Sequence, residues 1–561
     1  MNPQAPRSMP PGFVPARAPA MHAPTQVPGV DRPAFPDPTG TVILIVGVVL
    51  TWLAASGKTE SDLLVFCAWG TGVSLAASFL CDFRHGIRNM VRSDFLALLA
   101  IYGLCYAEFI MPDAEMRRVY DMGNEYEPTK RAVGLVSLAI VCFAAARHVT
   151  SKAPFTRSAL FTTPVTPMLL VRLFWACFFL GYLHQWIAVK GDLFEWLEAM
   201  TRRRWAQPWS RTHFGSWKSL LVELQLLMYV VTPLGAIIIV RRKRYSGAVV
   251  LFVVLALALN LFHAFSTGTR HIFFVHVILF TTAFCYFKQF TLKMILIYGG
   301  TAMLVMYFST NIMLSFRQVG LKRWMLEKNA GAVYQEEERS LYVDMTFQNL
   351  NRLVDRMPST FNHLGWEVVY WAAVRPIPRA MFPAKPEGLS TTLEEILYEP
   401  GAAGTWSVTY VGEAFMAFGP LGVVLFSGAF GLGAGYWNRF GCPTNSDMGI
   451  LIFASGFFQF SIAMRSMFEF MPAILPTMGL LFLMSWLLRN RIYLIPVTAE
   501  QRLANQAYSS ETLPPEISTD LPIPSEAAAG PVPRSFPSFT GVPPGHETQP
   551  SGPPPSPPRE S

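Results

Sequence analysis

Apolar segments of about 20 residues recur along the chain, and they constrain its fold more than any other feature. A helix of this length crosses roughly 30 Å of hydrocarbon, the thickness of a bilayer core. Such segments lie at residues 40–56, 62–80, 94–112, 132–149, 167–188, 217–240, 246–267, 271–288, 292–313, 409–436, 447–465 and 471–488. Because lipid offers the backbone no hydrogen-bond partners, these segments predict a bundle of helices. The predicted fold class is an all-α polytopic membrane protein with about twelve transmembrane helices.

The composition separates a very apolar middle from two proline-rich ends. Of the 561 residues, 52% are hydrophobic and only 15% are charged, whereas an ordinary soluble domain carries roughly 25% charge. This composition argues against a water-soluble enzyme. Of the 44 prolines, 11 lie in residues 1–38 and 15 in residues 499–561. We therefore expect disordered tails at 1–38 and 499–561, on either side of a transmembrane domain at 39–498.

Neither the cysteines nor the net charge predicts a metal site or a nucleic-acid partner. The seven cysteines lie in or beside apolar runs and show no C-x-x-C spacing, which is typical of small buried side chains. The formal net charge of +8 comes without a basic stripe interleaved with aromatics in a soluble domain. We therefore expect the lipid bilayer, and not nucleic acid, as the chain's surroundings.

Basic residues in the short connections predict the orientation of the bundle. Lysine and arginine accumulate in cytoplasmic loops of membrane proteins. The basic residues that follow the even-numbered segments share one side if both termini are cytoplasmic: Arg84, Arg88, Arg92, Arg147, Lys152, Arg157, Arg241, Arg242, Lys243, Arg244, Lys288, Lys293, Arg439, Arg489 and Arg491. The same plan predicts a large outer loop at about 314–408.

Several basic residues fall on the opposite, outer side. Arg270 and Arg465 occupy two very short turns there, and further basic residues lie in the loops at 189–216 and 314–408. Long outer loops escape the charge rule, which is a sufficient explanation for 314–408. Arginines beside a bilayer are costly and usually have an anionic partner, so the two in short turns favour an anion-binding site.

The segment 374–386 is the most informative part of the outer loop. Pro376 and Pro378 exclude a continuous helix and favour extended backbone before them, so Arg375 and Arg379 are held on a stiffened chain, with Lys385 close behind. Guanidinium groups bind phosphate oxygens in a planar fork, and a rigid pair is suited to clamp a phosphate. The alternative is a structural loop whose arginines pair with Glu387, Glu394 or Glu395.

Glu413 lies in the stretch V-G-E-A-F-M-A-F-G that opens the tenth apolar segment. A carboxylate near the start of a helix stabilises the helix dipole, which is one role for it. The other role is that of a general base beneath the arginine clamp.

These motifs together resemble a known family. The region 360–422 holds R-P-x-P-R…P-x-K-P followed by G-E-x-F-x-x-F-G, and S-T-G-T-R at 266–270, Phe316-Arg317 and Arg465 accompany it. Their order and common side resemble bacterial oligosaccharide repeat-unit polymerases of the Wzy type. The resemblance covers about 260–490 and extends to the layout with a large outer loop, which also fits a bundle like that of the GT-C glycosyltransferases.

The resemblance implies a metal-independent glycosyltransferase in the bacterial inner membrane. Its donor and acceptor would both be oligosaccharides on undecaprenyl pyrophosphate, joined on the outer face. A chain-length regulator and a flippase are the partners that such a polymerase implies. Arginines would stabilise the departing pyrophosphate, and the predicted substrate-binding residues are Arg270, Arg317, Arg375, Arg379, Lys385 and Arg465.

The attacking sugar hydroxyl needs a proton acceptor, for which Glu413 is the first candidate and His363 and Glu367 are alternatives. The latter two lie in the run 361–374, whose Trp366, Val369, Tyr370 and Ala373 share a helical face. Such a face suits a helix lying at the membrane surface, with its aromatics as anchors. We expect no cofactor, because the outer loop shows no D-x-D or H-x-H cluster.

Two other functions stay open on the sequence. A ligase that moves glycan to a different acceptor needs the same arginines. A transporter or flippase of lipid-linked glycan would carry charges within its spans around a central cavity. Here the spans hold few, chiefly Glu108 and Glu223, which disfavours transport.

Overall fold

The structure is a computed structural model, and it describes the chain in several stretches. These are residues 33–58, 60–110, 126–151, 158–203, 206–209, 218–287, 292–317, 319–329, 346–375, 377, 381–386, 389–397, 407–442 and 445–495. The predicted C-terminal tail and nearly all of the N-terminal tail lie outside these residues. Within them the regular structure is helical, and the one β-bridge joins Val165 to Leu494.

The helices follow the predicted apolar segments closely. Their bounds are α1 Pro38–Ala55, α2 Glu60–Phe83, α3 Ser93–Cys105, α5 Tyr126–Ser151, α6 Ala159–Thr162, α7 Pro167–Ala188, α8 Leu193–Met200, α9 Lys218–Glu223, α10 Met228–Val240, α11 Gly247–Ser266, α12 Arg270–Phe287, α13 Leu292–Phe316, α14 Leu321–Asn329, α15 Thr346–Arg356, α16 Trp366–Val374, α17 Leu389–Leu397, α18 Thr409–Asn438, α19 Asp447–Phe457, α20 Gln459–Arg465 and α21 Met467–Asn490.

Ten helical segments of the described residues are long and apolar enough to cross a membrane. They correspond to α1, α2, α5, α7, the run from Leu221 to Val240, α11, α13, α18, the run α19–α20, and α21. Two shorter apolar helices, Ser93–Cys105 and Arg270–Tyr286, occupy the third and eighth predicted segments. The protein is therefore an all-α, multi-pass membrane protein, and the count of twelve spans stays a prediction.

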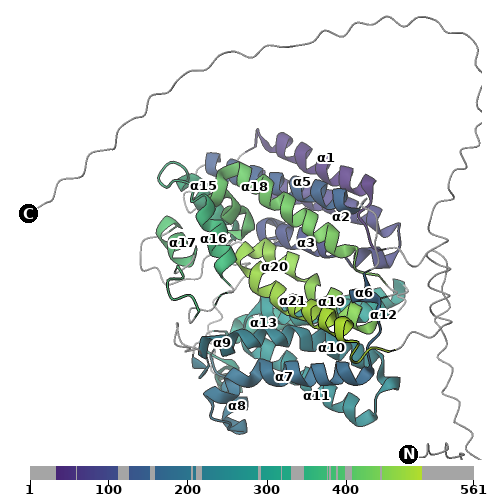
Figure 1. Ribbon diagram of the computed structural model, residues 1–561. Helices are drawn as coiled ribbons and strands as arrows, with labels where there is room; N and C mark the ends of the chain where they lie inside the picture. Colours follow the sequence, from purple (N-terminus) through teal and green to yellow (C-terminus); the bar gives the residue numbers. More distant parts are fainter. Residues whose placement is uncertain are drawn as a thin grey trace, which may run out of the picture. The chain divides into compact units, whose positions relative to one another are not determined.

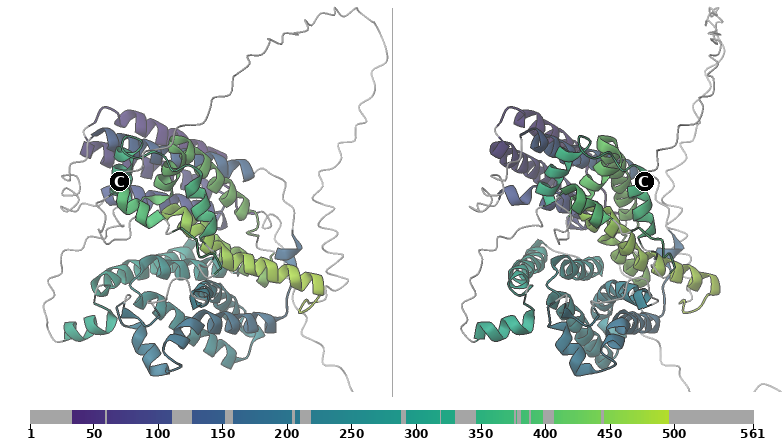
Figure 2. Two further views of the ribbon diagram at one scale, coloured as in Figure 1. Left: turned by 60° about the vertical axis from the view of Figure 1, so that its left-hand side comes forward. Right: turned by 90° about the vertical axis from the view of Figure 1, so that its left-hand side faces the viewer.

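Buried side chains gather in two main cores, which correspond to the upper and lower helix groups in Figures 1 and 2. The first core is formed by residues of α1, α2, α3, α5, α15, α16, α17, α18, α20 and the start of α21. The second is formed by residues of α6, α7, α8, α10, α11, α12, α19 and α21. The run from α19 to α21 thus contributes to both cores, and it connects the two groups.

The central contact of the first core is between α5 and α18. A Cβ atom on Gly431 would lie 2.5 Å from the Phe143 carbonyl oxygen, and one on Gly435 would lie 2.5 Å from that of Arg147. Small residues four apart allow two backbones to approach each other, which drives helix association where burial from water is no longer available. These two glycines therefore set the distance between α5 and α18.

The helix α18 is interrupted within its length. Phe418 (φ −139°) and Gly419 (φ 62°) have non-helical backbone, and Pro420 follows them. A left-handed φ favours glycine, and proline lacks the N–H that would continue the ladder. The sequence F-G-P therefore divides α18 into a first part that starts at Thr409 and a second part that ends at Asn438.

The carbonyl groups released by this interruption bind the outer loop. Leu364 N donates to Met416 O and Gly365 N donates to Ala417 O, both at 2.8 Å. Unsatisfied backbone groups cost several kcal/mol in hydrocarbon, so these two bonds allow the interruption to lie in a membrane segment. They also attach Leu364 and Gly365, which precede α16, to the helix α18.

At one end of the first core, a cluster of buried charges joins α2, α3, α5 and α18. Arg92 contacts Asp82 at 2.6 Å and Asp94 at 3.0 Å, and Arg147 contacts Asp94 at 2.7 Å. Asn438 Nδ2 also donates to Asp94. Arg92, Asp94 and Arg147 are 0% exposed. The sequence had suggested that Arg92 and Arg147 only set the orientation, whereas here they also hold four helices together.

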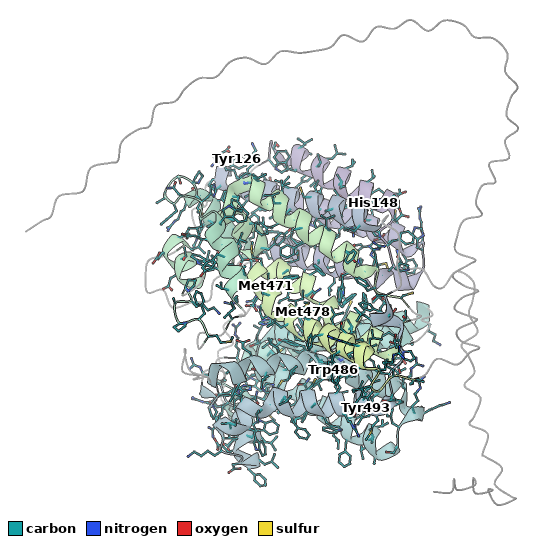
Figure 3. All side chains as sticks on the ribbon, viewed as in Figure 1. Tyr126, His148, Met471, Met478, Trp486 and Tyr493 are labelled. Atoms are coloured by element: carbon teal, nitrogen blue, oxygen red, sulfur yellow. The ribbon has the colours of Figure 1, made fainter. Side chains whose placement is uncertain are left out.

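The sequence predicts that the fourth and twelfth apolar segments start on the same side of the membrane, and α5 and α21 occupy these segments. In Figure 3, Tyr126 and His148 mark the two ends of α5, and Met471 and Trp486 show that α21 starts on the same side of the view. Both helices were predicted to start on the outer side. We call the end where they start the outer end, after that prediction, and the opposite end the inner end.

Contacts between loops agree with this arrangement. At the outer end, Asn351 Nδ2 donates to Thr129 Oγ1 at 2.9 Å, and Lys322 Nζ donates to Glu198 at 3.0 Å. Each pair joins loops that were predicted on the outer side. At the inner end, Asp447 pairs with Arg241 and Arg244. Which end faces the cytoplasm stays a prediction.

The helix α13 packs against the others mainly at its outer end. Only 11% of its apolar window is buried. Met313 and Phe316, in its last turn, belong to a small core with Ala264 of α11 and Phe273 of α12. The rest of α13 presents apolar side chains outward, Met303 and Phe308 among them.

A glycine substitution tests the contact between α5 and α18. We expect Gly435→Leu to lower the free energy of unfolding by about 2 kcal/mol or more, because the new side chain collides with the backbone of α5. Gly428→Leu is the matched control, since a Cβ there meets nothing within 4 Å. The measurement is the melting temperature in detergent, and equal melting temperatures for the two variants would contradict this packing.

Removal of one carboxylate tests the charge cluster. Asp94→Asn leaves Arg92 and Arg147 buried without their shared partner, so we expect a loss of about 3 kcal/mol in stability. Glu198→Gln also removes a carboxylate from ion pairs, but at the surface, and should leave the melting temperature unchanged. A small effect of Asp94→Asn would show that the cluster does not hold the helices.

Candidate functional site

The candidate site is built around the turn between α20 and α21. Arg465 ends α20, Ser466 has extended backbone (φ −161°), and α21 starts at Met467. The Ser466 hydroxyl accepts a hydrogen bond from Phe468 N at 3.2 Å, as an N-cap serine does. A single residue therefore reverses the chain at the outer end, and the residues on either side of it face neighbouring helices.

Glu413 holds this turn in place. Its carboxylate is buried, with the residue 3% exposed. Oε1 accepts from Ser466 Oγ at 2.5 Å, and Oε2 accepts from Met467 N at 2.6 Å. Glu413 thus stabilises the N-terminus of α21 in addition to lying on the first turns of α18. Both of its oxygens are engaged in hydrogen bonds.

Arg465 points toward the start of α12. Its Nη1 lies 3.3 Å from His271 Nδ1, and its backbone carbonyl accepts from Ser407 Oγ at 3.2 Å. Because α12 begins at Arg270, the two short outer turns that the sequence singled out lie next to each other.

Arg375 reaches the same region from the outer loop. It lies at the C-terminal end of α16, and its Nη2 is 3.2 Å from Oε1 of Glu469. The two side chains are 47% and 38% exposed. Arg375 therefore pairs with a residue of α21, not with Glu394 or Glu395 of its own loop. We call Arg375, Glu413, Arg465, Glu469 and His271 the junction cluster.

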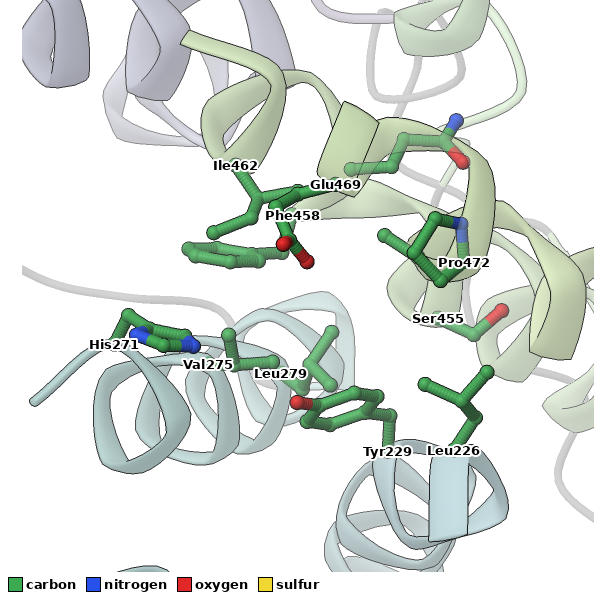
Figure 4. A pocket seen from close by; sticks show the side chains of 12 residues that line it. Leu226, Tyr229, His271, Val275, Leu279, Ser455, Phe458, Ile462, Glu469 and Pro472 are labelled. Carbon is green, nitrogen blue, oxygen red and sulfur yellow. The ribbon is translucent and has the colours of Figure 1, made fainter. Parts of the chain in front are cut away.

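A small pocket lies beside the junction cluster, between the two helix groups. Its volume is about 70 Å³. In Figure 4, Glu469 lies on one side of this pocket, and His271 and Tyr229 lie on the other. The side-chain oxygen of Gln459, also in its wall, is buried without a hydrogen bond within the described part of the chain. The pocket can hold a small polar group, and a sugar fits only if its rim opens.

The other predicted arginines and the lysine lie around the cluster. The backbone of Arg317 lies beside Gly268, where a Cβ would be 3.3 Å from the Arg317 Cα. Lys385 Nζ donates to the carbonyls of Arg375 and Ile377, at 2.5 and 2.8 Å, and so fastens the proline-rich turn. Arg379 lies outside the described residues, so the phosphate clamp of Arg375 and Arg379 stays a prediction.

His363 and Glu367 lie just before α16 and in its first turn. Glu367 is in the first turn of α16 and Arg375 directly follows its last residue, a separation of about 12 Å at 1.5 Å per residue. The His363 ring packs edge-on against Phe415, 5.2 Å between centroids, beside the interruption in α18. Glu367 is thus separated from Arg375 along α16, whereas His363 lies beside Phe415, two residues after Glu413.

The predicted surface helix is α16. Val368 and Ala372 are buried against the protein, whereas Trp366 and Tyr370, on the predicted outward face, are 74% and 48% exposed. This placement suits the predicted role of these aromatics as interface anchors.

The described residues hold no group of three histidine, cysteine or acidic side chains that could bind a metal ion. Five of the seven cysteines are buried. No family model, curated protein or solved structure matches this chain. The likeness to Wzy-type polymerases thus remains an inference from the motifs of the sequence.

Glu469 is the member of the cluster that sequence reasoning missed. One signal for it was present, because Glu469 lies four residues after Arg465, just before the twelfth apolar segment and on the predicted outer side. A carboxylate at that place is as unusual beside an apolar segment as the arginine before it.

Two alanine substitutions separate the roles of the two glutamates. We expect Glu413→Ala to cost about 1–3 kcal/mol of stability, because it leaves the buried donors Ser466 Oγ and Met467 N without an acceptor. Glu469→Ala removes only a half-exposed ion pair and should cost less than about 1 kcal/mol. Thermal unfolding of the purified variants measures both, and the reverse order would contradict the contacts described for Glu413.

Proposed function

We propose that the protein is a membrane glycosyltransferase that polymerises undecaprenyl-pyrophosphate-linked oligosaccharide repeat units. The reaction would take place on the outer face of the bacterial inner membrane, with both termini cytoplasmic. The observation that carries the proposal is the half-exposed Arg375–Glu469 pair at the rim of a pocket, next to Arg465 and His271. Such a pair offers a cation for a phosphate and a carboxylate for a proton at one place.

Arg375 is suited to the leaving group. Because it is half exposed, its bond to Glu469 contributes little to stability and can be exchanged for a phosphate. A pyrophosphate carries more negative charge than a single carboxylate and accepts both hydrogen bonds of an arginine fork, so it can replace Glu469. As the glycosidic bond to the lipid pyrophosphate breaks, Arg375 and Arg465 would stabilise the growing charge on the departing oxygens, with Arg270 and Arg379 as further members.

Exchange of the partner of Arg375 also releases Glu469. The acceptor's hydroxyl oxygen would then attack the donor's anomeric carbon while its proton passes to the Glu469 carboxylate. The carbon–oxygen bond to the pyrophosphate breaks, and its electron pair leaves with the lipid pyrophosphate. Glu413, whose two oxygens hold the turn between α20 and α21, would act as a positioning residue. His363 and Glu367 remain the alternative bases.

A ligase that transfers the glycan to a different acceptor remains the second candidate, because the same pair would serve it. Only the acceptor differs, and the products formed show which acceptor the enzyme uses. Of the two candidates, only the polymerase implies a chain-length regulator and a flippase as partner proteins.

Reconstituted enzyme tests the proposal. In vesicles supplied with undecaprenyl-pyrophosphate-linked oligosaccharide, we expect a ladder of longer glycans that persists when a metal chelator is added. Arg375→Ala and Glu469→Gln should each reduce chain growth by about 100-fold or more. Glu198→Gln is the matched control, since it neutralises another paired glutamate at the outer end, and it should retain full activity.

The products decide between the alternatives. Single transfer to a different acceptor without a ladder would indicate a ligase. Movement of the lipid across the bilayer without new glycosidic bonds would indicate transport. Full activity of Glu469→Gln together with an inactive but folded Glu413→Gln would return the role of base to Glu413. Loss of growth with the chelator, restored by a divalent metal, would overturn the metal-independent mechanism.

A further inference from the structure

A second, much larger cavity lies on the other side of α18 from the turn between α20 and α21. Its volume is about 710 Å³. We call it the α1–α5 groove, because α1 and α5 form most of its wall, with α15, His363 and the interrupted part of α18 completing it. The lining that matters for the argument is Trp52, Lys130, Arg131, Leu138, Val141 and His363.

The groove changes character along its length. The lining residues of α5 extend from Glu127 to Val141, a distance of about 21 Å along a helix. The charged ones, Glu127, Lys130 and Arg131, lie at the outer end, whereas those deeper in the membrane segment are apolar or small, such as Leu138. This order of residues can accommodate a ligand with a polar head and a long apolar body.

The two cations at the head of the groove are available to a ligand. None of the ion pairs among the described residues includes Lys130 or Arg131. Lys130 Nζ lies 5.9 Å from the centre of the Tyr126 ring, which leaves its protons free to donate elsewhere. Even with Glu127 ionised, the head of the groove carries a positive charge, which complements an anion.

The body of the groove is open toward the bilayer. Val49 and Trp52 line it and are 39% and 36% exposed. The Trp52 indole lies over Gly134, where a Cβ would be 3.2 Å from its Nε1. Phe415 and Pro420, on the two sides of the interruption in α18, line it as well. A hydrocarbon chain can therefore enter from the membrane without crossing water.

We propose that the α1–α5 groove binds a membrane lipid with a phosphate headgroup. The phosphate lies at Lys130 and Arg131, whose ammonium and guanidinium groups donate to its oxygens. The hydrocarbon tail lies along Leu138 and Val141. The inference is independent of the chemistry proposed for the junction cluster, because it concerns binding alone and holds for a polymerase, a ligase or a transporter.

Lipid binding to the purified full-length protein tests the proposal. The probes are a polyprenyl phosphate, the matching uncharged polyprenol, and inorganic phosphate, each followed by native mass spectrometry and by melting temperature in detergent. We expect the polyprenyl phosphate to bind and raise the melting temperature. The double variant Lys130→Gln/Arg131→Gln should bind it at least about tenfold more weakly. Leu138→Trp, which fills the body of the groove, should weaken binding as well.

The matched control is Lys190→Gln/Arg203→Gln, which removes two exposed cations outside the groove, in the loops predicted on the outer side, and should bind as the wild type does. Unchanged binding by the Lys130/Arg131 variant would overturn the proposal. So would polyprenol binding as tightly as the phosphate, or inorganic phosphate alone giving the full stabilisation. Activity of the junction cluster is measured separately, so the failure of one proposal leaves the other intact.

Discussion

The interruption of α18 at Phe418 and Gly419 is the constraint on which the outer half of the molecule depends. A membrane segment can leave the helical path only if other groups bind its released carbonyls, and here the backbone of Leu364 and Gly365 does so. That attachment brings α16 against α18, and with it Arg375 at the end of α16. The first part of α18 contributes to two places, with Glu413 bound to the turn before α21 and Phe415 in the wall of the α1–α5 groove.

The two ends of the bundle use the same charged groups in opposite ways. At the inner end, Arg92 and Arg147 share Asp94 without contact with solvent, and separation of such a pair is costly. At the outer end, Arg375 and Glu469 are both more than a third exposed, and water and other ions can replace either partner at little cost. The first arrangement maintains a fold, and the second permits chemistry.

The sequence predicted the helices well because hydropathy is a property of each segment alone. It also predicted that Arg270, Arg375, Arg379 and Arg465 lie on one face together with Glu413. Arg375, Glu413 and Arg465 do lie at the turn between α20 and α21, with Arg270 next to His271, whereas Arg379 lies outside the described residues. The sequence did not predict which carboxylate faces which donor. The bond from Met467 to Glu413 joins residues 54 positions apart, and the pairing of Arg375 with Glu469 joins residues 94 positions apart. Such partners depend on how the helices pack, and no local pattern records them.

The sparse packing of α13 has a consequence for the way the bilayer acts on this protein. The helix has 25 residues and is about 37 Å long, and its apolar span of 20 residues matches a hydrocarbon core of roughly 30 Å. Its outer end is held by Met313 and Phe316, and nearer its other end the Tyr298 ring contacts that of Phe284 in α12. Because so little of α13 is buried, we expect membrane thickness to change the tilt of this helix more readily than that of the others.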